Sequence, residues 1–213
     1  MEVINPEPPR DCPLCPRLVA YRMANRVGNP DWWNGPAPSF GDENARLLIV
    51  GLAPGRTGAN RTGRPFTGDH AGWLLYETLI KCGFATGVYE ARPDDTLRLV
   101  DCMITNAVRC APPGNKPETV EEQTCSRFLE SRIAALPRLK GIITLGDVSR
   151  RNVLKALGFK GSAATPGHGS VFDAGPYRIF NSYHCSRLNT NTGRLTPAMF
   201  EEVFRAARAH LDG

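Results

Sequence analysis

The sequence predicts an α/β fold in which helices cover both faces of a parallel sheet. The first observation is that four short apolar segments do not alternate with polar residues, as is typical of strands buried on both faces. The second is that helical patterns fall between and after these segments, which predicts a three-layer α/β/α arrangement. A chain of 213 residues is long enough for one such domain, so a single domain over residues 1–213 is expected.

The predicted strands are residues 46–50, 99–105, 141–145 and 177–182. Helices are predicted over 70–82, 117–136 and 147–157, and a last one begins at Thr196-Pro197. Gly83 and Gly158 are typical helix stops, and Pro at an early position followed by acidic residues is typical of a helix start. In the last helix, apolar residues recur at three- and four-residue steps.

Three polar loops follow predicted strands, at 51–69, 106–116 and 183–195. In doubly wound folds the site lies at the carboxyl ends of the strands. The loops are therefore expected to form one crevice that holds the opening loop, Asn106 and His184.

The composition favours a protein that works in the cytoplasm. The longest apolar runs are far too short to span a membrane, and the N-terminus has acids such as Glu2 and prolines where a signal peptide needs a basic start. The formal net charge of +5 favours a polyanionic partner only weakly.

Four of the seven cysteines form a candidate metal site. Cys12 and Cys15 form a CxxC motif, while Cys110 follows a predicted strand and Cys125 lies in a predicted helix, so both could approach it. Thiolates bind zinc or an iron–sulfur cluster, and both occupants are open at this point, as are four unrelated buried thiols. A disulfide framework is not expected in the cytoplasm.

The opening loop GLAPGRTGANRTGRPFTGD (51–69) is not a familiar nucleotide loop, because neither GxxxxGK[ST] nor GxGxxG is present. Phe66 in this loop is either a stacking surface or a core anchor. Asp69 precedes a helix, so an N-cap is its default role. Asn106 could read a donor/acceptor edge or end a turn, and His184 stands at a strand end.

The motifs resemble the uracil-DNA glycosylase superfamily, and within it the iron–sulfur-bearing UDGb (family 5) branch. The matching strings are GLAP (51–54), GANRTGRPFTGD (58–69), TNAVRCAPPGNKP (105–117) and HCSRLNTNTGRLT (184–196). The resemblance implies a central four-stranded parallel sheet and a [4Fe–4S] cluster on Cys12, Cys15, Cys110 and Cys125. It also implies DNA repair by a monofunctional enzyme that hydrolyses the N-glycosidic bond of a flipped base.

The resemblance also implies roles for the site residues. Phe66 would stack on the flipped base and Asn106 would bond its O4/N3 edge. His184 and backbone N–H groups of the 51–54 loop (Gly51, Leu52, Ala53) would stabilise negative charge on O2 of the leaving uracil. A carboxylate would favour the oxocarbenium-like sugar.

Two residues depart from the family pattern. Ala53 stands where the wider superfamily often has an acid or amide, which leaves Asp69 as the candidate to activate water, against a water held by backbone groups. Cys185 stands where Pro commonly follows the active-site His. No inserted basic loop precedes His184, so turnover is expected rather than covalent capture of uracil.

The resemblance implies a DNA surface as well. The loop after His184, with Arg187, Leu188 and Asn189, would enter the duplex, with Leu188 as the wedge that replaces the flipped base. Candidate phosphate contacts are Arg61, Arg64, Arg187 and Arg194.

The expected partner is double- or single-stranded DNA that contains uracil or another deaminated base such as hypoxanthine, bound by a monomer. One alternative is a non-catalytic module that binds uracil or damaged DNA, which Ala53 favours. Another is a small-molecule nucleotide hydrolase, which lacks the expected carboxylates for a metal–phosphate site.

Overall fold

The centre of the protein is a mixed sheet of strands in the order β1-β5-β2-β6-β8-β7. We describe residues 5–213 of a computed structural model, so Glu2 lies outside the described residues. The four inner strands are all parallel, and the outer strands β1 and β7 pair antiparallel to their neighbours. The strands are β1 (Phe40–Gly41), β2 (Leu47–Gly51), β5 (Cys102–Asn106), β6 (Gly141–Leu145), β7 (Val171–Ala174) and β8 (Tyr177–Ser182).

The four predicted strands are therefore confirmed as the parallel core, but the sheet itself has six strands rather than four. The two additional strands are edge strands of two and four residues. Segments this short have no continuous apolar run that would predict a strand. They are strands because they pair with β5 and β8.

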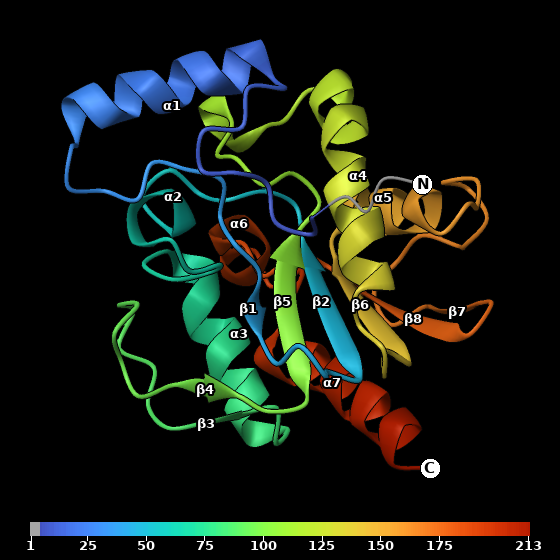
Figure 1. Cartoon of the computed structure of the whole chain (residues 1–213). Coiled ribbons are helices and arrows are strands. Elements are labelled where there is room, and N and C mark those ends of the chain that lie inside the picture. The colour runs from blue at the N-terminus through green and yellow to red at the C-terminus, as the bar shows by residue number, and fades with distance from the viewer. Residues whose placement is uncertain (1–4) are drawn as a thin grey trace.

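Helices cover both faces of the sheet, as Figure 1 shows, so the three-layer arrangement is confirmed. Helices α3 (His70–Lys81) and α7 (Pro197–Asp212) supply the apolar side chains of one core, which includes Leu47 and Ile49 of β2. Helices α4 (Thr119–Ala134) and α5 (Asp147–Ala156) pack on the other face, against Leu48 and Val50.

Local side-chain chemistry starts the helices near the predicted residues. The Asp69 side chain accepts a hydrogen bond from the Gly72 N–H, and Thr196 does the same for Met199. Glu118 and Glu121 form a capping box at the start of α4. The helices end within two residues of the predicted bounds, which is the usual scatter at a frayed terminus.

Helix α1 (Pro16–Gly28) was not predicted, and it lies beyond the carboxyl ends of the strands (Figure 1). Its buried residues are Leu18, Arg22 and Asn25, two of which are polar, so the sequence lacks the apolar stripe that would predict this helix. The remaining short elements are α2 (Ala59–Thr62), β3 (Ala85–Thr86), β4 (Arg98–Leu99), the 3₁₀ turn η1 (Pro113–Asn115) and α6 (Arg187–Asn191). Within residues 5–213, no helix combines the length and apolar character that crossing a membrane requires.

Candidate functional site

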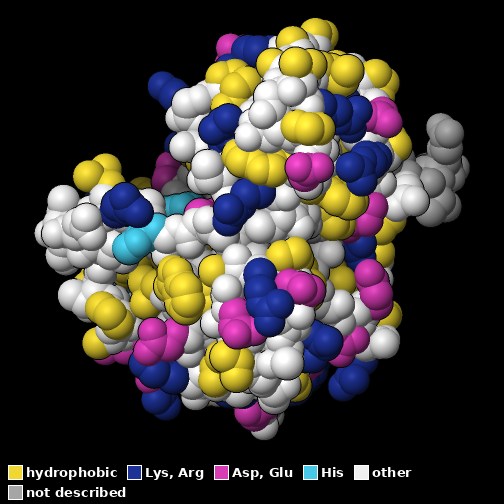
Figure 2. Space-filling view, turned by 90° about the vertical axis from the view of Figure 1, so that its left-hand side faces the viewer, with side chains coloured by type: hydrophobic (Ala, Val, Ile, Leu, Met, Phe, Trp, Pro, Cys, Tyr) yellow, Lys and Arg dark blue, Asp and Glu magenta, His cyan; other side chains and the backbone are white. Residues whose placement is uncertain are grey.

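A cavity of about 620 Å³ opens at the carboxyl ends of β2, β5 and β8. Figure 2 shows histidine side chains in a hollow of the surface, with Arg or Lys side chains nearby. The register of the sheet explains the convergence, because Gly51 at the end of β2 lies directly beside Asn106 at the end of β5. Phe66, Asp69 and His184 also line the cavity, so the predicted crevice is confirmed.

Phe66 forms one wall of the cavity with its ring. Its backbone is in the left-handed region at φ 53°, and the residue is 7% exposed. The ring centroid lies 6.1 Å from that of His184, with 33° between the ring planes. A left-handed conformation is uncommon for a bulky residue, so contacts from the surrounding structure must hold it there.

Asn106 presents a free carboxamide to the cavity. The residue is 2% exposed, and within residues 5–213 its side chain has no hydrogen-bond partner. A methyl group placed on Gly51 would lie 2.5 Å from Asn106 Oδ1 and 2.6 Å from Phe66 Cζ. Glycine at position 51 therefore leaves the space in which both side chains sit.

His184 closes the cavity at the end of β8. Burial lowers the pKa of its imidazole, which favours the neutral ring. Its backbone carbonyl accepts a hydrogen bond of 2.8 Å from the Asn189 side chain, while neither ring nitrogen has a partner in the described part of the chain. A neutral imidazole can still donate one N–H to a ligand atom.

Asp69 combines a structural contact with a place in the cavity wall. Its Oδ1 accepts the Gly72 N–H at 3.2 Å, which confirms the N-cap. Its Oδ2 faces Gly55 and Gly58, where a methyl group would lie 3.3 Å and 2.4 Å away. Burial raises the pKa of the carboxyl group, against the lowering effect of the backbone N–H groups.

Comparison with known proteins agrees with this geometry. Residues 38–208 match the profile of the uracil DNA glycosylase superfamily. The chain belongs to the uracil-DNA glycosylase superfamily. A type-5 uracil-DNA glycosylase of Thermus thermophilus is 45% identical over 204 residues, which are 92% of each chain. One of Pyrobaculum aerophilum is 42% identical over 93% of this chain and 88% of its own. A type-4 uracil-DNA glycosylase of Thermotoga maritima is 32% identical over 97% of this chain and 92% of its own.

The loop that follows His184 in this superfamily member forms α6, capped by the Ser186 side chain. Arg187 lines the cavity, and Leu188 is 72% exposed, so Leu188 does not pack beneath its own loop. Asn189 and Arg194 line a neighbouring cavity, where the Arg194 guanidinium lies 4.5 Å from the centre of the Tyr183 ring.

Arg61 is exposed but does not line the cavity at the strand ends. It lines a separate groove together with Trp32, Trp33 and Arg92. The Arg10 guanidinium lies 4.3 Å from the centre of the Trp33 ring at the same groove.

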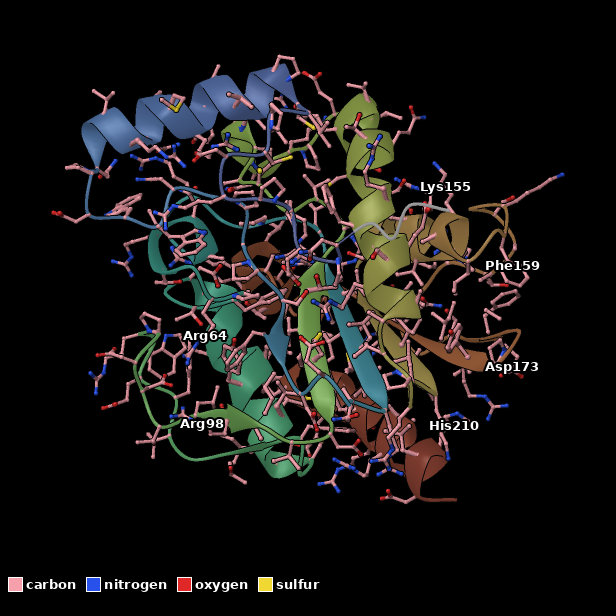
Figure 3. All side chains as sticks on the ribbon, viewed as in Figure 1. Arg64, Arg98, Lys155, Phe159, Asp173 and His210 are labelled. Carbon is pink, nitrogen blue, oxygen red and sulfur yellow. The ribbon has the colours of Figure 1, made fainter. Side chains whose placement is uncertain are left out.

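The prediction that Arg64 contacts a DNA phosphate is wrong. Arg64 is 5% exposed, and its two Nη atoms each lie 2.8 Å from a carboxylate oxygen of Asp95, which is 3% exposed. In Figure 3 it lies within the packed region beside α3, whereas Lys155 and Asp173 lie at the edge of the molecule. A guanidinium that is enclosed and paired in this way holds the loop together and is not available to a phosphate.

The four cysteines singled out by the sequence line one small apolar cavity beneath α1. The Arg109 N–H donates to Cys125 Sγ at 3.4 Å, and Arg22 Nη1 lies 3.8 Å from Cys110 Sγ. Arg22 Nε is buried and without a partner in the described structure. Hydrogen-bond donors directed at sulfur suit thiolate ligands, so the residues present fit a thiolate-bound group.

Several polar residues that line this cavity were not among the predicted site residues. They are Arg56, Thr57, His70, Asn115 and Ser186. All of them lie in or beside the three loops at the strand ends, so the topology was the available signal. Cys185, the departure beside His184, is fully buried in the core between the sheet, α3 and α7.

Proposed function

We propose that the protein is a monofunctional glycosylase that removes uracil from DNA and leaves an abasic site. The observation that carries this proposal is the convergence of Phe66, Asp69, Asn106 and His184 in one cavity at the strand ends. Membership of the superfamily and the similarity to type-5 uracil-DNA glycosylases support it.

In this proposal the flipped base stacks on Phe66. Asn106 meets the O4/N3 edge, because a carboxamide offers an acceptor and a donor side by side. Its lack of any other hydrogen-bond partner among the described residues supports this role, since a buried free amide needs one.

Bond cleavage leaves negative charge on the departing uracil, much of it on O2. His184 in its neutral form and the backbone N–H groups of Gly51, Leu52 and Ala53 stabilise that charge. The C1′–N bond breaks, water supplies hydroxide to C1′, and the remaining proton neutralises the base.

Asp69 assists the attack of water in this proposal, because Ala53 has no polar side chain at the position where the wider superfamily often has an acid or amide. One oxygen of Asp69 caps α3, which leaves Oδ2 at the cavity wall. An ionised carboxylate there also favours positive charge on the sugar.

The proposal extends to hypoxanthine and other deaminated bases. A cavity of about 620 Å³ leaves room beyond a single pyrimidine, and an amide can rotate to match a different base edge.

The test is incubation with oligonucleotides that each contain one uracil, opposite G, opposite A or in a single strand, followed by alkali. Strand cleavage at the uracil is the expected result, with Asn106→Ala and His184→Ala slowing it more than they weaken DNA binding. A protein that cleaves none of these, nor a hypoxanthine substrate, would not be a glycosylase. Retention of uracil-DNA in a gel without base release would then identify the second candidate, a binding module that Ala53 favours.

We propose further that Cys12, Cys15, Cys110 and Cys125 hold a [4Fe–4S] cluster with a structural role. The shared cavity and the donors directed at sulfur support it. Among residues 5–213, no three Cys, His, Asp or Glu side chains lie close enough to bind a single metal ion. The proposal therefore depends on the shared cavity and on the donors directed at Cys110 and Cys125.

Anaerobic purification followed by iron, sulfide and zinc analysis tests the cluster. We expect about four iron atoms and four sulfides per chain and broad absorbance at roughly 400 nm. Cys110→Ser should lose the iron, the sulfide and the absorbance. Cys82→Ser is the matched control, since Cys82 is buried elsewhere and should change none of them. A colourless protein with one zinc per chain would refute the cluster.

The proposed substrate is DNA, bound by one copy of the chain that acts as a single domain. The strands of the main sheet join segments from residue 40 to residue 182, which supports a single domain. Sedimentation of the protein with and without a uracil duplex tests the expected stoichiometry of one.

A further inference from the structure

Tyr89 lies outside the cavity but contacts the loop that carries Phe66. We propose that Tyr89 is a positioning residue for uracil excision, whose hydroxyl holds the Phe66 backbone in the conformation that turns the ring toward the base. This inference rests on the proposed function.

The hydroxyl of Tyr89 bridges the loop on both sides of Thr67. It donates to the Phe66 carbonyl at 3.0 Å and accepts the Gly68 N–H at 3.4 Å. Both bridged residues have positive φ, 53° for Phe66 and 89° for Gly68. Glycine adopts positive φ at little cost, whereas phenylalanine does not. The hydrogen bond from Tyr89 to the Phe66 carbonyl therefore holds the residue whose backbone is strained.

The first turn of α3 makes room for this contact. A methyl group on Gly72 would lie 1.9 Å from the Phe66 oxygen and 2.4 Å from the Tyr89 hydroxyl. Glycine at position 72 therefore lets both groups approach the helix. Asp69 caps the same turn by accepting the Gly72 N–H, so the Phe66 carbonyl and the Asp69 carboxylate both lie next to Gly72.

The Tyr89 ring has little freedom to move. It packs against Tyr76 with a centroid distance of 4.5 Å and against Trp73 at 5.0 Å. The residue is 8% exposed, and burial raises the pKa of its hydroxyl to about 12. The hydroxyl thus stays protonated and able to donate throughout any ordinary assay range.

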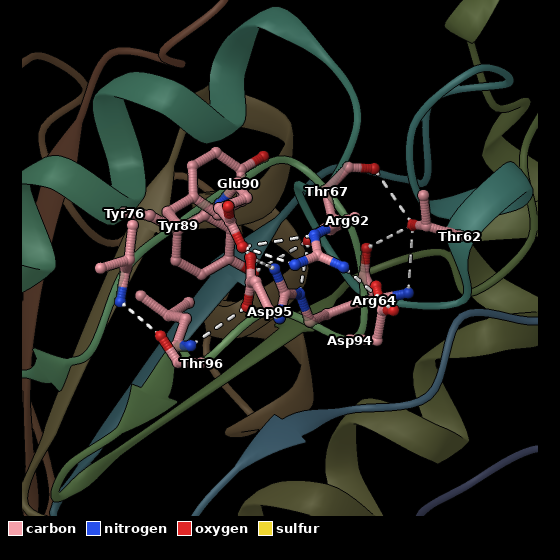
Figure 4. Close-up of polar contacts among 12 residues, drawn as sticks. Thr62, Arg64, Thr67, Tyr76, Tyr89, Glu90, Arg92, Asp94, Asp95 and Thr96 are labelled. Carbon is pink, nitrogen blue, oxygen red and sulfur yellow. Dashed lines mark hydrogen bonds and ion pairs between the residues drawn. The ribbon is translucent and has the colours of Figure 1, made fainter.

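The segment that carries Tyr89 is itself fixed to the Phe66 loop, as Figure 4 shows. Asp95 pairs with both Nη atoms of Arg64, and it accepts the N–H groups of Glu90 and Leu97 at 3.0 Å and 3.1 Å. One buried carboxylate therefore connects the residue next to Tyr89 with the arginine two residues before Phe66. The two segments can keep a fixed spacing.

Tyr89→Phe tests the proposal because it removes one oxygen and keeps the packing. Under single turnover with saturating enzyme, we expect uracil release to slow about tenfold, the factor that loss of one hydrogen bond of typical strength produces. The affinity for undamaged DNA should stay the same. Tyr177→Phe is the matched control, because the Tyr177 hydroxyl has no partner within residues 5–213.

A double-mutant cycle separates positioning from general destabilisation. In a Phe66→Ala background, Tyr89→Phe should change the rate by less than about twofold, because the ring that it positions is gone. In an Asp69→Asn background it should keep its tenfold effect. Equal effects in the wild-type and Phe66→Ala backgrounds would overturn the proposal, as would a Tyr89→Phe enzyme with wild-type rate.

A second readout keeps the two proposals apart. The ratio of the Kd for undamaged DNA to the Kd for DNA with one 2′-fluoro-deoxyuridine, an analogue that resists cleavage, should fall several-fold in Tyr89→Phe. A wild-type protein that releases no uracil refutes the proposed function. The positioning role is then judged on this ratio alone, and equal ratios in both proteins overturn it.

Discussion

Replacing Arg64 with Met separates the two roles that the sequence and the structure assign to this arginine. In the structure Arg64 and Asp95 are a buried pair joined by two hydrogen bonds of 2.8 Å. Removing one partner of such a pair leaves an uncompensated buried charge, which typically costs about 3–5 kcal/mol of stability. For a chain of 213 residues this corresponds to a fall of roughly 6–20 °C in the thermal midpoint.

The pKa of Asp95 gives the same prediction a pH signature. Burial raises the pKa of Asp95, but the hydrogen bonds and charge of Arg64, together with the N–H groups of Glu90 and Leu97, outweigh burial and lower the pKa from 3.8 to about 2. A lowered folded-state pKa contributes stability that is present above 3.8 and is lost as the pH falls toward 2. The shift of nearly two pKa units corresponds to roughly 2 kcal/mol, and Arg64→Met should remove most of it.

The assay combines thermal unfolding with DNA affinity measured over a series of salt concentrations. We expect Arg64→Met to lower the midpoint while the folded variant keeps the wild-type salt slope. Arg187→Met is the matched control, since Arg187 is exposed and lines the cavity. Loss of a phosphate contact there should reduce the slope by about one and leave the midpoint unchanged. A stable Arg64→Met protein with a reduced salt slope would refute the structural role.

Three further predictions concern the pocket and its rim. Gly51→Ala should slow uracil release by about 5- to 150-fold, because the new methyl group overlaps two side chains of the cavity, and overpacking of this kind typically costs about 1–3 kcal/mol. Gly28→Ala, where nothing lies within 4 Å, should leave the single-turnover rate unchanged. Leu188→Ala should slow excision from duplex DNA more than from single-stranded DNA. Val171→Ala is the control, because Val171 is 52% exposed on an edge strand and its loss should affect neither rate. Equal losses of rate on both substrates would exclude a wedge role for Leu188. Burial raises the pKa of Asp69 above 3.8, so the ionised carboxylate is lost as the pH falls and the logarithm of the single-turnover rate should decline below that pKa. Asp69→Asn should be slow and should show no such decline. A decline that persists in Asp69→Asn would assign it to another group.

The sequence predicts the position of the site well because topology determines it. Runs of apolar residues located the parallel strands, and the carboxyl ends of parallel strands share one edge. The pairing of Gly51 with Asn106 is the direct consequence, and it brings two motifs 55 positions apart into contact.

The sequence does not predict which arginine is free. Arg64 and Arg187 both lie in polar loops, and nothing in their own neighbourhoods distinguishes them. What separates them is Asp95, which comes from another loop and accepts both ends of the Arg64 guanidinium. Helix α1 was not predicted for a related reason. Its buried face contains Arg22, which donates to the Cys12 carbonyl, and Asn25, which accepts from Arg56, so the partners lie outside the helix.

One short segment joins the cavity at the strand ends to the cysteine cavity, and the backbone N–H groups of residues 107–109 are all hydrogen-bonded. After Asn106, the N–H groups of residues 107 and 108 donate to the carbonyls of residues 51 and 52, at 2.9 Å and 3.0 Å. The N–H of Arg109 then donates to Cys125 Sγ, and the next residue is Cys110. The Arg109 guanidinium is 1% exposed and binds Glu7, Ser39 and Thr105, which ties the N-terminal segment with Cys12 to the same place. The backbone from Asn106 to Cys110 is therefore held by hydrogen bonds to residues 51 and 52 and to Cys125, which fixes the spacing between the two cavities.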